Sequence, residues 1–140
     1  TCKVRPSVKA TPAPSSATYS AAALVAAHTA LRDVIDSGSG AGFVRIRSAA
    51  DVLLAQVPLS DPCGSVNGTT GQLTLSIAGV DAGADATGTA AYGEVCDSDG
   101  DVHLALPASA GASAVAGYLV LNTLSIVSGV PVAISSATIG

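Results

Sequence analysis

The apolar positions change their spacing at about residue 40, and this change separates a helix from a series of strands. Between residues 18 and 36 there is neither glycine nor proline, and apolar residues recur at helical spacing. The predicted apolar face consists of Leu24, Ala27, Leu31 and Ile35. We expect one amphipathic helix at about 18–36, with Thr18 or Ser20 as its N-cap and Gly38 as its C-terminal stop.

Beyond residue 42 the apolar residues alternate with polar ones or form short runs, as they do in strands. Seven segments are predicted to be strands: 43–47, 52–59, 72–78, 87–96, 101–106, 115–121 and 130–138. Pro58 marks an edge or the exit of the second strand. The sequence Asp-Ser-Asp-Gly at 97–100 predicts a hairpin turn between the fourth and the fifth.

Short strands separated by Gly, Asp, Asn and Pro turns favour a mainly β fold, a β-sandwich or jelly roll. The single helix would lie on one side or at one end of the sheets. Residues 1–17 contain three prolines, a composition typical of an extended arm or linker. The 140-residue chain therefore divides into an N-terminal arm (1–17) and one β domain (18–140).

Charge is divided unevenly along the chain. All six basic residues lie within the first 47 positions, whereas residues 48–140 hold eight acidic residues and no basic one. Such an acidic body repels phosphate backbones, so we expect no nucleic-acid partner. No apolar run reaches the ~18–20 residues that a membrane span needs, so we expect no membrane partner. Lys3, Arg5 and Lys9 make the arm basic, which suits a solvated tail or an arm that docks on an acidic protein surface.

The three cysteines show no metal-binding spacing. Cys63 and Cys96 are expected to be small apolar core residues. A disulfide between them is the alternative, and it would require an oxidising compartment.

Two other motifs have a chemical and a structural interpretation. Residues 97–101 (Asp-Ser-Asp-Gly-Asp) resemble a calcium loop, but Val102 and Ala108 occupy the positions where an EF-hand needs glycine and glutamate. A plain hairpin turn is therefore preferred. The glycines of 38–42 follow the predicted helix instead of opening one, so we interpret them as a connection and not as a phosphate-binding loop.

Candidates for catalysis are few. His28 and His103 are the only histidines, and we expect both to be structural or surface residues. The chain has no GxSxG motif, and the aspartates at 97, 99 and 101 fall on one tight turn and not across a cleft. We therefore expect no enzyme, no catalytic residue, no cofactor and no metal.

Several segments resemble the capsid cement (decoration) proteins of tailed bacteriophages, such as those of Bordetella podophages. The resemblance covers about residues 20–140 and is carried by turn and strand motifs. They are Gly-Ser-Gly-Ala-Gly-Phe-Val-Arg-Ile-Arg (38–47), Leu-Ser-Asp-Pro (59–62), Ala-Asp-Ala-Thr-Gly-Thr-Ala (84–90), Asp-Ser-Asp-Gly (97–100), Leu-Val-Leu-Asn-Thr (119–123) and Ser-Ile-Val-Ser-Gly-Val-Pro-Val (125–132).

The resemblance implies a β-sandwich or jelly roll that binds the outer face of a capsid as a dimer or trimer and cements neighbouring major capsid subunits. Such a protein would be assembled in the bacterial cytoplasm and reside on the exterior of the virion. The expected contact residues are Lys3, Arg5 and Lys9 in the arm and Arg45 and Arg47 in the first strand. The alternatives are a tail or baseplate protein of the same fold and a secreted adhesin or carbohydrate-binding module.

Overall fold

The predicted helix is present and begins at the second of its two possible caps. In the computed structural model, which describes residues 18–140, α1 (Ala21–Ile35) follows Ser20. The Ser20 hydroxyl accepts a hydrogen bond from the backbone N–H of Ala23 at 3.1 Å, as an N-cap does. The helix ends before Gly38, with Asp36 as its C-cap, and the N–H of Asp36 donates to the carbonyl of Arg32.

The buried face of α1 differs by one residue from the predicted face. Ile35 is fully buried and Leu24 and Leu31 are half-buried, as expected, but Ala27 is exposed. His28 is buried in its place, and its Nδ1 lies 2.5 Å from the carbonyl oxygen of Gly71. Because a carbonyl only accepts, the imidazole donates this bond and holds the loop after the second strand to the helix.

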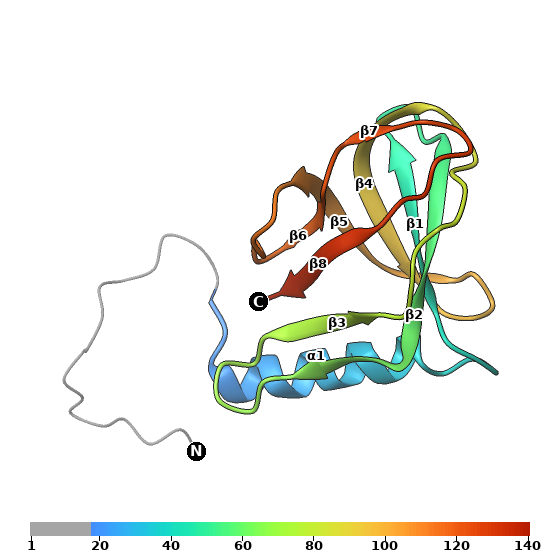
Figure 1. Cartoon of the computed structure of the whole chain (residues 1–140). Helices are drawn as coiled ribbons and strands as arrows, with labels where there is room; N and C mark the ends of the chain where they lie inside the picture. Colours follow the sequence, from blue (N-terminus) through green and yellow to red (C-terminus); the bar gives the residue numbers. More distant parts are fainter. Residues whose placement is uncertain (1–17) are drawn as a thin grey trace, which may run out of the picture.

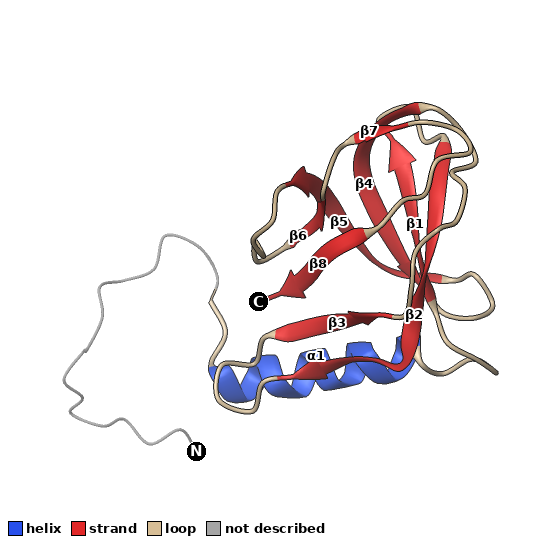
Figure 2. Cartoon of the chain, viewed as in Figure 1, coloured by secondary structure: helices blue, strands red, loops and turns tan. Residues whose placement is uncertain are grey.

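Eight strands follow the helix, and seven of them close into a barrel (Figures 1 and 2). They are β1 (Phe43–Ser48), β2 (Leu53–Val66), β3 (Leu73–Ile77), β4 (Gly88–Cys96), β5 (Val102–Ala110), β6 (Tyr118–Leu121), β7 (Ser125–Ile126) and β8 (Ile134–Ile139). The order around the barrel is β1-β2-β3-β8-β6-β5-β4, and β4 pairs again with β1. Only the two-residue β7 lies outside the ring, beside β4.

The prediction of a mainly β fold with one helix is confirmed, whereas the sandwich or jelly-roll arrangement is not. The difference lies in the antiparallel ladder that joins β1 to β4 from Phe43–Cys96 to Ser48–Ala90. This ladder satisfies the backbone groups that would otherwise form two sheet edges. Neither partner's sequence shows the closure, because an alternating strand looks the same in a sandwich and in a barrel.

The second strand is much longer than predicted, because it serves two neighbours in turn. Its first part pairs with β1 up to Pro58, and its second part, from Leu59 to Val66, pairs with β3. Pro58 lies where the strand changes partner, so its missing N–H removes no continuous ladder bond. The predicted strand exit at Pro58 is therefore wrong, although the proline does mark a break in the pairing.

Strands β1, β3 and β4 follow the prediction closely, whereas β5 continues to Ala110, four residues past its predicted end. The hairpin around 97–100 is confirmed, since β4 and β5 pair antiparallel on either side of it. Strand β6 begins at Tyr118, three residues later than predicted, and β8 begins at Ile134. The short β7 was not predicted.

The interior is filled by aliphatic side chains, chiefly from the inward positions of the strands. The largest fully buried side chains are Ile35, Ile46, Leu54, Leu59, Leu73, Leu119 and Leu121. Helix α1 lies along β2 at one end of the barrel, so that Ile35 joins this core (Figure 1).

Within residues 18–140 no helix is long and apolar enough to cross a membrane. The predicted arm with Lys3, Arg5 and Lys9 lies outside the described residues.

The connection from α1 to β1 passes close to the chain between β4 and β5. A side chain at Gly42 would collide with the carbonyl oxygen of Cys96, and one at Gly38 with the hydroxyl of Ser98. Gly40, between them, has no neighbour within 4 Å of the position that a Cβ would occupy. Gly38 and Gly42 thus allow the α1–β1 connection to lie against the segment at Cys96 and Ser98. Gly40 has no such role.

This difference predicts that Gly42→Ala lowers the free energy of unfolding by about 1–3 kcal/mol, because the β1 and β4 backbones must separate to admit the methyl group. Gly40→Ala is the matched control and should change the stability by less than about 0.5 kcal/mol. Urea denaturation followed by circular dichroism measures both. Equal effects of the two substitutions would show that the close approach at Gly42 does not constrain the fold.

Candidate functional site

The two arginines predicted to bind a partner lie on the outer face of the barrel, together with side chains from β4. In the β1–β4 ladder Arg45 lies opposite Glu94 and Arg47 opposite Tyr92. Residues opposite each other in an antiparallel pair share a face, so these four form one surface with Phe43. We call the five residues the contact strip. Val44 and Ile46, which alternate with them, are fully buried inside.

Arg47 is bound within the protein. Its Nε donates to the Glu94 carboxylate, and its Nη1 donates to the backbone carbonyl of Asp51 at 3.0 Å. The hydrogen bond to Glu94 raises the pKa of Arg47 further above its ordinary value. The side chains of the pair are about one-fifth exposed, 23% and 20%. Arg47 therefore supports the strip and has little capacity left for a partner.

The same network fixes the loop between β1 and β2. Asp51 has a φ of 64°, a left-handed conformation that is uncommon outside glycine but tolerated by aspartate. Its carboxylate accepts a hydrogen bond from the Tyr92 hydroxyl at 2.6 Å, which raises the pKa of Tyr92. Arg47 and Tyr92 thus hold this loop from two sides.

Arg45 makes weaker contacts within the protein than Arg47 does. Its guanidinium lies 5.0 Å from the centre of the Phe43 ring, a cation–π geometry. Its Nη1 lies 3.4 Å from the carbonyl oxygen of Gly100, at the long limit for a hydrogen bond. Among the described residues no carboxylate forms an ion pair with Arg45. A carboxylate of a partner could therefore bind here.

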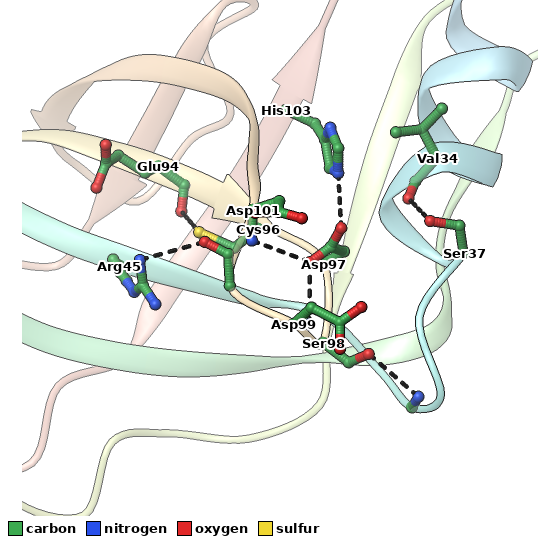
Figure 3. A network of polar contacts seen from close by, with 12 residues as sticks. Val34, Ser37, Arg45, Glu94, Cys96, Asp97, Ser98, Asp99, Asp101 and His103 are labelled. Atoms are coloured by element: carbon green, nitrogen blue, oxygen red, sulfur yellow. Dashed lines mark hydrogen bonds and ion pairs between the residues drawn. The ribbon is translucent and has the colours of Figure 1, made fainter.

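The turn that Arg45 reaches is organised around one buried carboxylate (Figure 3). Asp97 is 5% exposed, and its Oδ1 accepts hydrogen bonds from the N–H groups of Asp99 and Asp101, both at 3.0 Å. Its Oδ2 lies 2.9 Å from Nε2 of His103. The bond to His103 is the main reason why the pKa of Asp97 lies below its ordinary value.

The turn is also fastened to the α1–β1 connection. The N–H of Gly40 donates to the Ser98 hydroxyl at 3.3 Å, and the Ser37 hydroxyl donates to the carbonyl of Val34 at 2.6 Å (Figure 3). Asp36 accepts two hydrogen bonds from the N–H of Cys63, at 2.9 and 3.1 Å. The polar groups at this end of the barrel therefore join backbone segments to one another.

Both described cysteines are buried free thiols, as the interpretation as small core residues predicts, and they do not form a disulfide. Burial, with Asp36 nearby, raises the pKa of Cys63 to about 12. Burial also raises the pKa of Cys96. Since the thiolate is the reactive form, neither environment activates sulfur.

A pocket of about 180 Å³ lies beside β7, a strand at the opposite end of the barrel from α1 in Figure 1. It is formed by the segments on either side of β7, with Thr123, Val127, Val130 and Pro131 among its lining residues. No histidine, cysteine or charged residue lines it. Among residues 18–140 no group of three or more His, Cys, Asp or Glu side chains is placed to hold a metal ion.

The sequence predicted the two arginines of the contact strip, and the structure adds the residues that lie beside them. Arg45 and Arg47 share a face as alternation predicts, but their partners come from a strand about fifty residues away. Tyr92, Glu94 and Asp51 were not predicted as part of this surface, since only the β1–β4 register places them there. His28 and His103 are both in structural contacts, as predicted.

Comparisons of the chain with protein-family models, with curated proteins and with solved structures find no match.

The buried contact of Asp97 predicts a loss of stability in acid. A carboxylate whose folded pKa is lowered stabilises the fold above its unfolded pKa, about 3.9, and this contribution disappears as the pH falls through the folded pKa. The urea midpoint of the protein should exceed that of Asp97→Asn at pH 7, and the difference should shrink below pH 4. The exposed neighbour supplies a control, since Asp99→Asn should leave the urea midpoint at pH 7 unchanged. A difference for Asp97→Asn that persists to pH 2 contradicts the assignment.

The burial of Cys63 and Cys96 predicts that their thiols react slowly with Ellman's reagent in the folded protein. In the variant Cys2→Ser, which leaves only Cys63 and Cys96, Ellman's reagent at pH 8 should react with the folded protein far more slowly than with the urea-unfolded chain. A pKa of about 12 instead of 9.0 corresponds to roughly a thousandfold less thiolate at Cys63. Release of one equivalent of chromophore within seconds from folded protein would show that a thiol is accessible.

Proposed function

We propose that this protein is a non-enzymatic virion protein of a tailed bacteriophage, which binds the outer face of the capsid and cements neighbouring major capsid subunits. It acts on the shell as a dimer or trimer. In this proposal the barrel is a closed variant of the jelly roll of the decoration proteins that the sequence resembles.

The observation that carries the proposal is the composition of the contact strip on a closed barrel. Arginine and aromatic residues are enriched at protein interfaces and dominate their binding energy. Here the only phenylalanine of the chain lies on the outer face beneath Arg45, and not in the core. Arg47 and Tyr92 hold the adjacent loop, so the strip is rigid before a partner binds.

The use of the polar side chains supports the same proposal. His28, His103, Asp97 and Glu94 each hold one backbone segment or side chain of the fold to another. A protein that acts by contact needs such rigid loops. Repetition of the contact around a symmetric shell then makes a modest interface effective through avidity.

The decisive experiment is to add the purified protein to shells assembled from the major capsid protein of the phage that encodes it, and to map the particles by electron microscopy. Density for the barrel on the outer face of the shell, between capsid subunits, is the expected result. Density on the tail, or retention of the protein on a glycan array without binding to shells, would contradict the proposal.

Within that assay, Arg45→Ala should weaken binding to shells about fivefold or more, the effect of truncating an interface arginine worth above about 1 kcal/mol. Arg32→Ala, which removes an arginine from α1 that pairs with its neighbour Asp33, is the matched control and should bind as the unmodified protein does. Co-sedimentation at increasing protein concentration measures both. Equal binding of the two variants would remove the contact strip from the interface.

A further inference from the structure

The barrel end that carries β7 is a half-exposed apolar surface without a partner in the described chain. Val127 and Val130 are each 49% exposed. They line the 180 Å³ pocket, and the N–H of Val130 donates to the carbonyl of Val127. Asp81 and Asp85 lie beside them, because Asp81 forms a two-way backbone bridge with Val132, and Ala84 exchanges hydrogen bonds with Val130 and Gly129. We call Asp81, Asp85, Val127 and Val130, with this pocket, the end surface.

The charge of the end surface is negative. The Asp81 carboxylate is fixed by the N–H groups of Gln56 and Gly83, at 2.8 and 3.0 Å. Asp85 is exposed. Neither forms an ion pair with a described residue, and the chain contains no basic residue after Arg47. A ligand of this surface therefore combines small apolar groups with positive charge.

The arm of the chain has this combination in its sequence. In residues 3–9 (Lys-Val-Arg-Pro-Ser-Val-Lys) the odd positions are basic or polar and the even positions are apolar. Because successive side chains of an extended segment point to opposite sides, Val4, Pro6 and Val8 would share one face and the three cations the other. Extended peptides are recognised by pockets for alternate side chains in this way.

We propose that the arm of one copy binds the end surface of a second copy. Val4 or Val8 enters the pocket beside Val130, and the cations of the arm lie near Asp81 and Asp85. The interaction occurs in solution and does not depend on the proposed attachment to a capsid.

The placement of the two elements favours exchange between copies. The described chain begins at the α1 end of the barrel, whereas β7 lies at the other end (Figure 1). An arm that bound its own end surface would have to run the length of the barrel, while a neighbouring copy can present its end surface directly. Each copy then gives one arm and accepts one, which closes into a dimer or a small ring.

The test uses three full-length variants and measures their mass by sedimentation equilibrium, without capsids present. The arm variant is Lys3→Glu with Arg5→Glu and Lys9→Glu, and the pocket variant is Val130→Lys. The control is Val115→Lys, at a valine that is 44% exposed but does not line the pocket. Circular dichroism verifies that each variant is folded.

We expect the unmodified protein and the control to form an oligomer, and each of the other two variants to raise the dissociation constant at least tenfold. Mixing the arm variant with the pocket variant should restore a heterodimer, because the intact arm of one meets the intact pocket of the other. The proposal is wrong if the unmodified protein stays monomeric, if the arm variant associates normally, or if the mixture stays monomeric. Because shells are absent from this assay, its failure leaves the proposed capsid function to be judged by electron microscopy.

Discussion

The ladder between β1 and β4 is the constraint on which the rest of the structure depends. Without it the strands would form an open sheet with two unpaired edges, and the inward valines and isoleucines would lack their opposite wall. The ladder also creates the outer surface, because it sets Arg47 against Tyr92 and Arg45 against Glu94. One set of backbone pairings thus determines both the core and the proposed contact strip.

A few buried polar groups make this barrel rigid where its loops meet. Asp97 satisfies two N–H groups of its own turn and binds His103, and His28 binds the loop that precedes β3. A buried polar group is costly without a partner, so each of these contacts specifies one loop conformation. The chain uses its few chemically versatile side chains for this purpose, which agrees with a role based on contact.

The uneven charge of the chain has a structural counterpart. Of the three described arginines, Arg32 pairs with Asp33, Arg47 pairs with Glu94, and Arg45 packs on Phe43. The carboxylates of the end surface have no cation of their own in the barrel, and the remaining basic residues belong to the arm. The proposed binding of the arm to a second copy follows from this separation, since opposite charges on two parts of one chain favour association between copies.

The sequence by itself determined the local elements. Alternation predicted β1 and β3, the Asp-Ser-Asp-Gly turn predicted the β4–β5 hairpin, and helical spacing predicted α1, with Ser20 among its predicted caps. These features depend on neighbouring residues, whose spacing is visible along the chain. Only the tertiary structure decided that the strands close into a barrel, that β2 continues past Pro58, and that Tyr92, Glu94 and Asp51 join the arginines. Such choices depend on which distant strands pair and in which register, and alternating sequences are compatible with several pairings until the whole core is packed.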